Sequence, residues 1–453
     1  MTQKIKNMKN KIVVLAYSGG LDTSYCLKKL SSDGYQVHAI TINTGGFSNE
    51  EINQISKKAK KLGAKTYKCI NAISPFYNKI VKYLIFGNIL KNNTYPLSVS
   101  SERIIQAIEI VNYSNKVQAK YISHGSTGAG NDQVRFDQIF QILSPKTEII
   151  TLIRDLNLSR KDEINYLKSK RVMIDWKKAK YSINKGLWGT SIGGSETLTS
   201  KHPLPEKAYP SQLKLKNEKK IKLEFKNGEL ISLNSKKDSP INIIRDLENI
   251  AKKYAIGRDI HIGDTIIGIK GRVAFEAAAP LIIIKAHHLL EKHTLSKWQQ
   301  FQKESISSFY GMLLHEGQYF DPVMRDIESF LSNNKLAMVV HESNLPEGKG
   351  FAPLQWQILE GKNKIPIVLF QADLKIDTGK ILLRDIIKLR GDELCYEWRK
   401  IQGIKTIDLC LQFTKNMKTI VGVKQKKLKA TYYSRRTQND SIIDINKSIK
   451  EQF

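Results

Sequence analysis

The sequence predicts an α/β protein that begins with a doubly wound parallel sheet. An apolar run at residues 12–15 stops in a Ser-Gly-Gly turn and is followed by a helical pattern. Strand-like and helix-like stretches then alternate, which is typical of βαβ units. With 453 residues the chain is too long for one core, so we expect two or three domains.

The first domain is expected to alternate strands and helices. Strands are predicted at residues 11–16, 36–41 and 119–123, and helices at residues 22–32, 50–62 and 101–113. The second of these helices is rich in lysine and ends at Gly63, a residue type that favours helix ends. Ligands of such sheets bind at the carboxyl ends of the strands, so the turns after the strands are the candidate site.

After about residue 176 the pattern changes to that of an α+β domain. Apolar and polar residues alternate over residues 220–234 around Asn227-Gly228, a strong hairpin signal. A helix is expected from Ser239-Pro240 to Gly257, followed by strands within residues 259–270 and helices within residues 281–332.

The chain is strongly basic, with 73 basic and 43 acidic residues and a net charge of +30. Because lysine is spread along the whole chain and no aromatic-rich RNA motif occurs, we interpret this charge as a solvated surface and expect no nucleic-acid partner. No apolar run is long enough to cross a membrane and no signal-peptide pattern occurs, so a cytoplasmic location is expected. The four cysteines lack metal-site spacing.

The first motif is Ala-Tyr-Ser-Gly-Gly-Leu-Asp-Thr-Ser at residues 16–24. Gly19 and Gly20 let the backbone approach an anion, and N–H groups of the turn and the next helix point at phosphate oxygens. The motif resembles the Ser-Gly-Gly-x-Asp-Ser/Thr loop of the ATP pyrophosphatases, which have the adenine nucleotide alpha hydrolase-like fold. Those enzymes cleave ATP between the α- and β-phosphates and adenylate a substrate.

The second motif follows the strand expected at residues 119–123. It begins at His124 and reads His-Gly-Ser-Thr-Gly-Ala-Gly-Asn-Asp-Gln-Val-Arg-Phe-Asp, with three glycines and several polar side chains. A merely polar surface loop does not need this combination. We therefore expect both glycine-containing turns to serve one site.

With both motifs in view, residues 11 to about 334 resemble argininosuccinate synthase. Further support comes from Tyr-Ser at Tyr181 and Leu-Trp-Gly-x-Ser-Ile at Leu187. The family joins citrulline to aspartate through a citrullyl adenylate, releasing AMP and pyrophosphate, in arginine biosynthesis and the urea cycle. The resemblance implies ATP and Mg²⁺ as cofactors, citrulline and aspartate as substrates, an α+β synthetase domain and no protein cage for a metal.

The same resemblance implies roles for individual residues. The ATP-binding set is Ala16, Tyr17, Ser18, Gly19, Gly20, Leu21, Asp22, Thr23, Ser24, Ile42 and Gly125. The aspartate-binding set is Thr127, Asn131 and Asp132. The citrulline-binding set is Tyr95, Ser100, Asn131, Arg135, Ser182 and Ser191. Asp22, Asp132 and Arg135 are the expected catalytic residues, with Asp132 accepting from the aspartate amine and Arg135 forking onto a carboxylate.

Some positions depart from the family pattern. Val99 stands before Ser100 where the family has Thr. Two citrulline contacts, a Glu and a Tyr in the family, fall near Gly263 and Phe275, with Asp264 as a candidate substitute for the Glu. We hypothesise that the substrate is citrulline or an N-acylated relative.

From about Lys335 the chain resembles part of a folate-dependent formyltransferase instead. The resemblance rests on Val-His-Glu-Ser-Asn-Leu-Pro-Glu-Gly-Lys-Gly and on Ile-Asp-Thr-Gly-Lys-Ile, and places His341 and Asp377 at formyl-transfer positions, with Val339 in place of an Asn. The first half of that fold is absent. We therefore expect His341 and Asp377 to be vestigial, with little or no formyl transfer, and this segment to pack on the synthase body or be poorly ordered. The family's homotetramer is not carried over, because the segment that helps to hold it is replaced.

The predicted domains are residues 1–175, 176–334 and 335–453. Three alternative functions are considered at this point. The first, a non-catalytic binding protein, is opposed by the intact Ser18, Gly19, Gly20, Asp22, Thr127, Asn131, Asp132 and Arg135. A tRNA-modifying pyrophosphatase-loop enzyme would suit the charge, although no cysteine lies between Cys69 and Cys395 for sulfur transfer. A bifunctional ligase and formyltransferase is opposed by Val339 and by the missing half of the fold.

Overall fold

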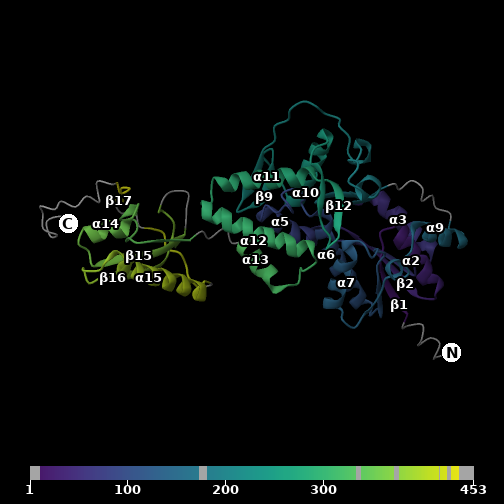
Figure 1. The fold of residues 1–453 in the computed structure, drawn as a ribbon, viewed down its shortest axis with the longest axis horizontal. Helices are drawn as coiled ribbons and strands as arrows, with labels where there is room; N and C mark the ends of the chain where they lie inside the picture. The colour runs from purple at the N-terminus through teal and green to yellow at the C-terminus, as the bar shows by residue number, and fades with distance from the viewer. Residues whose placement is uncertain are drawn as a thin grey trace. The chain divides into compact units, whose positions relative to one another are not determined.

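A computed structural model describes residues 11–172, 181–332, 338–371, 377–417, 419–425 and 430–437. The chain divides into two compact units, Met1–Ser332 (unit 1) and Asn333–Phe453 (unit 2). Both predicted domain boundaries, near residues 175 and 334, lie outside the described residues. No described helix is long and apolar enough to span a bilayer. Figure 1 shows the elements of each unit.

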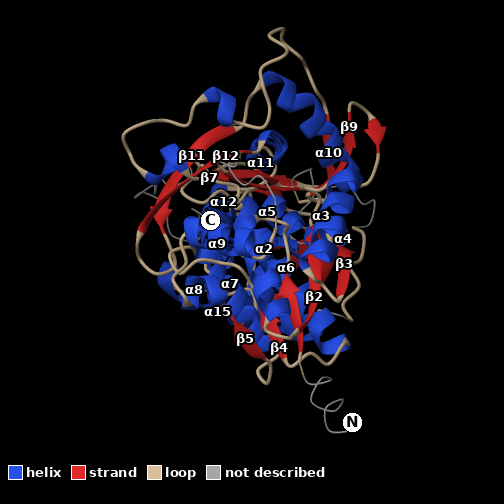
Figure 2. Ribbon diagram, turned by 90° about the vertical axis from the view of Figure 1, so that its right-hand side faces the viewer, coloured by secondary structure: helices blue, strands red, loops and turns tan. Residues whose placement is uncertain are grey.

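Unit 1 begins with a five-stranded parallel sheet, as predicted. Its strands are β1 (Ile12–Ala16), β2 (Gln36–Asn43), β3 (Thr66–Asn71), β4 (Tyr121–Ser123) and β5 (Glu148–Ile150), in the order β3-β2-β1-β4-β5. The chain runs from β1 to one edge and then returns to β4 on the other side of β1 (Figure 2). This reversal between β1 and β4 is a topological switch point, where open α/β sheets bind ligands.

Helices cover both faces of this sheet, because successive side chains of a strand point to opposite sides. Val13 and Leu15 pack in one core with residues of α2 (Leu21–Ser32), α3 (Asn49–Leu62) and α9 (Arg160–Ser169). Val14 packs in another core with residues of α6 (Ser98–Lys116) and α7 (Asn131–Leu143). Shorter helical pieces are α4 (Ile73–Phe76), η1 (Tyr77–Val81), α5 (Lys82–Phe86) and α8 (Leu152–Asp155).

The remainder of unit 1 is the expected α+β part. An antiparallel sheet has the order β11-β12-β7-β6, with β6 (Ser182–Gly186), β7 (Gly189–Gly193), β11 (Arg258–Asp264) and β12 (Lys270–Glu276). The predicted hairpin is formed by β8 (Leu223–Lys226) and β9 (Glu229–Leu233), and β10 (Lys236–Lys237) pairs with β9. The helices are η2 (Ser195–Leu198), η3 (Glu206–Ala208), α10 (Pro240–Ala251), η4 (Lys252–Tyr254), α11 (Ala278–Lys292), α12 (Lys297–His315) and α13 (Pro322–Ser332).

One helix is shorter than the sequence predicted. The helix expected to reach Gly257 ends at Ala251, after which the chain tightens into η4 and passes through Ala255 at φ +51°. Gly257 has φ +75°, and a Cβ there would lie 2.5 Å from the α-carbon of Ala278. The close approach of α11 therefore requires the chain to turn before β11, and the sequence pattern alone did not reveal that contact.

Unit 2 is built on a three-stranded antiparallel sheet in the order β13-β15-β16, with β13 (Met338–His341), β15 (Lys364–Gln371) and β16 (Ile381–Lys388). Ile365, Ile367 and Leu369 pack with α14 (Pro353–Leu359) and α15 (Cys395–Asn416). Val368 and Phe370 pack with Leu345 on the opposite face. A short parallel pair joins β14 (Lys349–Gly350) to β17 (Tyr432–Tyr433). The described residues of unit 2 therefore form an ordered core of their own, and the expectation that this segment packs on the synthase body stays a prediction.

Candidate active site

The first part of the candidate site is the turn at residues 18–20, between β1 and α2. Gly19 has φ +77°, which glycine adopts without strain, and a Cβ there would meet Ile55 of α3 at 3.1 Å. Gly20 is the N-cap residue of α2 and has no side chain that could bind the N–H groups of the first helical turn. These N–H groups are therefore available to an anion. The hydroxyl oxygens of Ser18 and Thr23 lie 3.2 Å apart beside them. This turn has the donors that a phosphate needs.

The second glycine-rich turn, after β4, reaches the same place. A Cβ at Gly125 would lie 3.1 Å from Cγ2 of Thr23 and 3.2 Å from its backbone nitrogen. The two turns therefore meet at the first turn of α2, at the switch point of the sheet. Of the residues expected to bind ATP, Tyr17, Leu21, Ser24 and Ile42 are buried, whereas Ser18 and Gly20 are exposed.

A histidine-centred network supports the second turn. His124 accepts from the backbone N–H of Ser126 through Nδ1 (3.2 Å), so its Nε2 carries the hydrogen that is donated to Asp137 (2.9 Å). Arg154 of α8 donates to the other oxygen of Asp137 at 2.6 Å. Thr127, expected to bind aspartate, is exposed at the tip of this turn. The network fixes the turn against α7 and α8.

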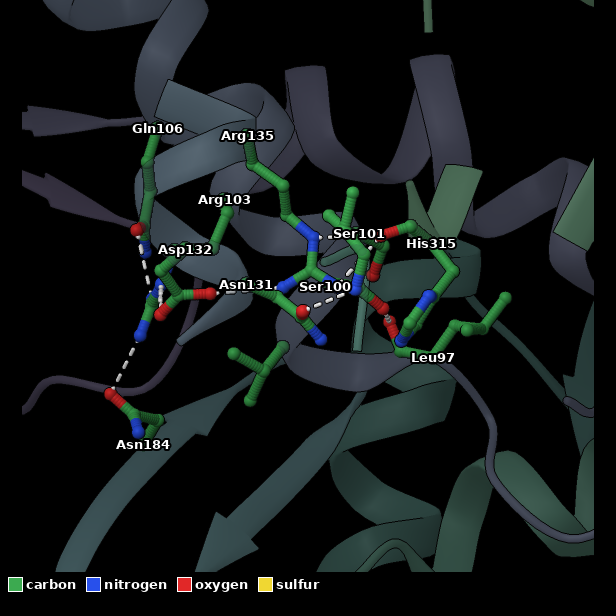
Figure 3. Close-up of polar contacts among 12 residues, drawn as sticks. Leu97, Ser100, Ser101, Arg103, Gln106, Asn131, Asp132, Arg135, Asn184 and His315 are labelled. Atoms are coloured by element: carbon green, nitrogen blue, oxygen red, sulfur yellow. Dashed lines mark hydrogen bonds and ion pairs between the residues drawn. The ribbon is translucent and has the colours of Figure 1, made fainter. Parts of the chain in front are cut away.

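Asp132, in the first turn of α7, lies between two arginines (Figure 3). Its Oδ2 accepts from Nε of Arg103 at 2.8 Å, and its Oδ1 accepts from Nη1 of Arg135 at 2.9 Å. Arg103, on α6, also donates to Asn184 of β6 (2.8 Å) and to Gln106 (2.9 Å). We refer to Arg103, Asp132 and Arg135 as the arginine cluster. It joins α6, α7 and β6.

The charges of this cluster keep Asp132 ionised. Burial alone would raise the pKa of Asp132, but Arg103 and Arg135 together outweigh it and hold that pKa below its ordinary value. The position at the start of α7 also favours a negative charge. Because the Asp132 side chain is still 32% exposed, its remaining lone pairs can receive a hydrogen bond from a bound ammonium or amine.

Arg135 is held a second time, at the end of α12. Its Nε and Nη2 both donate to the backbone oxygen of His315, at 2.9 and 2.7 Å. The fork that was expected to face a substrate carboxylate therefore faces a main-chain carbonyl here. Asn131 is tied to the turn between β11 and β12, because its Oδ1 accepts from the N–H of Ile266 at 2.8 Å. Residues 131–135 thus connect α7 to two distant parts of unit 1.

The expected citrulline residues lie partly together. Tyr95 is buried, and its hydroxyl accepts from the N–H of Val99 at 3.1 Å, so the substitution at Val99 leaves this contact intact. Ser100 is buried on α6, where its hydroxyl donates to Leu97. Ser191 is buried on β7, paired across the sheet with Asn184. Ser182, at the far end of β6, is exposed.

The positions that depart from the family pattern border Tyr95. Phe275, paired with Ser191, has its ring 5.4 Å from that of Tyr95, and His261 stacks on Tyr95 at 5.2 Å. A Cβ at Gly263 would meet Nε2 of His261 at 2.8 Å. The Asp264 carboxylate, expected as a substitute for the family's Glu, is exposed and paired with Lys270 at 2.6 Å.

Asp22 has a carboxyl neighbour that the sequence did not indicate. Glu163 of α9 is 2% exposed; burial, and then the negative charge of Asp22, raises the pKa of Glu163 to about 8. Both causes favour the protonated form of Glu163, which reduces the negative charge beside Asp22. Among the described residues no group of three or more His, Cys, Asp or Glu is arranged to hold a metal ion.

Sequence reasoning missed Arg103, Asn184, Glu163 and the histidine-centred network. For Arg103 a signal was present. Ser100, Arg103 and Gln106 recur at a spacing of three, which places these three polar side chains on one side of the helix. Asn184 and Glu163 carried no such signal, because only the packing of distant segments brings them to the site.

In unit 2, the two expected residues lie near each other. The Nε2 atom of His341 is 2.9 Å from the backbone oxygen of Gly348 and 3.8 Å from Oδ2 of Asp377. The same Asp377 oxygen accepts from the N–H of Gly350 at 2.9 Å. Both side chains are thus engaged with the turn at residues 348–350.

Comparisons with known proteins agree with this geometry. Residues 12–173 match the family model "Arginosuccinate synthase N-terminal HUP domain", and residues 181–340 match "Arginosuccinate synthase C-terminal domain". Argininosuccinate synthase of Methanocaldococcus jannaschii is 38% identical over 72% of this chain and 83% of its own length. The enzyme of Pyrococcus furiosus is 35% identical over 72% of this chain and 80% of its own.

A solved methionyl-tRNA formyltransferase from Clostridium thermocellum is also similar, at 28% identity, covering 26% of this chain and 51% of its own. Its TM-score of 0.24 does not establish a shared fold.

Proposed function

The chain belongs to the argininosuccinate synthase family, and from this premise we propose how its residues carry out the reaction. The enzyme is an ATP-dependent ligase that joins citrulline and aspartate through citrullyl-AMP. The ureido oxygen of citrulline attacks the α-phosphorus, and the bond to the β-phosphate breaks to release pyrophosphate. The aspartate amine then attacks the ureido carbon and AMP leaves.

The observation that carries the proposed roles is the meeting of the two glycine-containing turns. The turn at residues 18–20 would hold the β- and γ-phosphates, with Gly125 against the nucleotide. The arginine cluster would then hold the amino acids beside the α-phosphorus. Asp132 would accept from the aspartate amine, while Asn131 and Thr127 would donate to the aspartate carboxylates. Arg135 would donate to the citrulline carboxylate with the Nη hydrogens that its contacts with Asp132 and His315 leave over. The rate would come from alignment and charge neutralisation, since the ureido oxygen is a weak nucleophile.

Mg²⁺ would enter with ATP. Magnesium is commonly held by substrate phosphates and one or two carboxylates, so a full protein cage is not required. Asp22, in the first turn of α2, fits this pattern as a carboxylate beside the turn at residues 18–20. When bound, the ion would neutralise phosphate charge, and the chain's own part would be to keep Asp22 oriented through its contact with α9.

The amino-acid end of citrulline is proposed to be held less selectively than in relatives. Gly263 supplies no side chain, Phe275 has no hydroxyl, and Asp264 is paired with Lys270. An acyl group on the citrulline nitrogen would therefore meet no buried carboxylate at these positions. We expect kcat/KM for N-acetylcitrulline to be within about tenfold of that for citrulline, because the ammonium charge that acetylation removes has no buried carboxylate partner at these positions. A preference for citrulline of more than about a thousandfold would contradict this.

Unit 2 is proposed not to transfer formyl groups. His341 and Asp377 are engaged with Gly348 and Gly350, and Val339 provides no amide side chain. Incubating the full chain with a formylated tetrahydrofolate and an amine acceptor should give no formylated product. Formyl transfer that is lost in the variant His341→Ala would refute the proposal.

Pyrophosphate release tests the main assignment. We expect pyrophosphate release from ATP to require citrulline. Argininosuccinate should form only when aspartate is also present. Release with tRNA alone would favour a tRNA-modifying enzyme. Absence of ATP consumption with both amino acids present would overturn the proposed function.

A further inference from the structure

Lys58 of α3 is a charged residue beside the turn at residues 18–20, and the proposed function above gives it no role. Its ammonium donates to the backbone oxygen of Gly19 at 2.5 Å. On the same helix Lys57, Lys60 and Lys61 are exposed, whereas Lys58 is half-buried. A lysine-rich helix thus directs one of these side chains to the middle of the phosphate-binding turn.

The position of this lysine is set by a well-anchored helix. α3 begins at a capping box, in which Ser48 accepts from the N–H of Glu51 (3.2 Å) and Glu51 accepts from that of Ser48 (2.8 Å). It ends at Gly63, which has φ +104°. Ile55, three residues before Lys58 and so on the same side of the helix, packs against Gly19. The ammonium therefore reaches the turn from a fixed base.

The electrostatics of Lys58 favour an anionic partner. The half-buried ammonium loses part of its hydration, and this burial lowers the pKa of Lys58 to about 8. A phosphate oxygen carries a full negative charge and would stabilise the ammonium more than the carbonyl of Gly19 does. Within the proposed reaction, the triphosphate of ATP is the anion that comes to this turn.

We propose that Lys58 binds the departing pyrophosphate, with its ammonium moving from the Gly19 carbonyl to an oxygen of the β- or γ-phosphate. The inference rests on the proposed function. When the ureido oxygen attacks, the bond between the α-phosphorus and the bridging oxygen breaks, and the electron pair stays on the β-phosphate. The Lys58 ammonium and the first-turn N–H groups of α2 would together neutralise this charge.

The variant Lys58→Met tests this role against Lys61→Met, an exposed lysine of the same helix. We expect Lys58→Met to lower kcat/KM for ATP about 100-fold and to weaken product inhibition by pyrophosphate at least about tenfold. KM for citrulline and for aspartate should stay within about twofold. Lys58→Arg should recover most of the loss, and Lys61→Met should match the wild type.

Thermal melting with and without inorganic pyrophosphate separates binding from mere support of the turn. If Lys58 binds pyrophosphate, ligand-free Lys58→Met should have the same Tm as the wild type. Adding pyrophosphate should raise the Tm of the wild type but not that of the variant. A lower ligand-free Tm with a normal pyrophosphate response would overturn the proposal. If Lys58→Met does not fold, Lys58→Gln gives the same measurements. Should the wild type make no argininosuccinate, the proposed function fails, while the pyrophosphate response still tests Lys58.

Discussion

The turn at residues 18–20, which we call the phosphate turn after its proposed role, and the arginine cluster lie at the same end of the parallel sheet. They are built from different groups. The turn at residues 18–20 offers mainly backbone N–H groups, with short hydroxyls beside them. The arginine cluster consists of charged side chains from α6 and α7, supported by the carbonyl of His315 and the amide of Asn184.

The difference predicts different sensitivities to substitution. A site made of backbone depends on shape, so it should fail when a side chain intrudes. A site made of paired charges should fail when one charge is removed, because its partner is left buried and uncompensated. Substitutions in the two regions should therefore damage different steps and by different amounts.

The largest effect is expected for Asp132→Asn in the arginine cluster. Condensation should slow by about a thousandfold or more, because the amine loses its charged acceptor. Citrulline-dependent pyrophosphate release should fall less than about tenfold, because Arg135 is still held by the carbonyl of His315. Each half-reaction is measured separately, with the exposed Asp33→Asn as control. Equal losses in both half-reactions would contradict the role of Asp132.

A somewhat smaller effect is expected for Arg103→Met. Removing this guanidinium frees one side of Asp132, so kcat/KM for aspartate should fall about 100-fold while KM for ATP stays within about twofold. Gln106→Ala removes only an acceptor of Arg103 and should cost less than about fivefold. If the two variants behave alike in steady-state kinetics, Arg103 does not organise the cluster.

On the backbone side, Gly125→Ala should weaken ATP binding about tenfold. The new Cβ would press on Thr23 at the first turn of α2 and shift the phosphate donors. Gly128→Ala, in the same turn, is the matched control, since its Cβ would meet only a side-chain carbon of Arg154 at an ordinary 3.5 Å. ATP binding is measured by titration of both variants. Equal weakening by Gly125→Ala and Gly128→Ala would contradict this role of Gly125.

The last prediction concerns stability and not a step of the reaction. Glu102, next to Arg103, is 1% exposed, and burial raises its pKa to about 8. The unfolded carboxyl loses its proton near pH 4.5 and the folded one near 8, so the native state loses stability as pH rises between these values. Glu102→Gln should remove this loss. As the pH rises, the free energy of unfolding of the variant should therefore increase relative to that of the wild type by a few kcal/mol, which is the order of magnitude of the shift.

Urea unfolding of this variant between pH 5 and 8 provides the measurement. Glu109→Gln, on the same helix but partly exposed, serves as its control. Parallel stability curves for the wild type and Glu102→Gln would show that Glu102 does not titrate in this range.

The phosphate turn was predictable because its evidence is local. The apolar run before Ser18, the two glycines and the helical pattern after them fix a strand, a turn and a helix without reference to the rest of the chain. The same local evidence predicted the parallel sheet, which the structure confirms. The family resemblance then supplied expected roles for Asp132 and Arg135.

The supports of these residues were not predictable in the same way. Arg103 meets Asp132 across 29 positions, and Arg135 meets His315 across 180. Such contacts depend on where α12 ends and how α6 crosses the sheet, which no local pattern encodes. The core of unit 2 was not predicted, because the burial of both faces of β15 depends on packing against α14, α15 and Leu345, which lie far from it in the sequence.

The most direct test of the account follows one oxygen atom. Citrulline labelled with ¹⁸O in the ureido group is incubated with ATP, aspartate and the full chain, and the products are examined by mass spectrometry. The account predicts that the label appears in AMP, because the ureido oxygen becomes bonded to the α-phosphorus when pyrophosphate leaves the turn at residues 18–20. Label in pyrophosphate, or AMP formed without label, would contradict it.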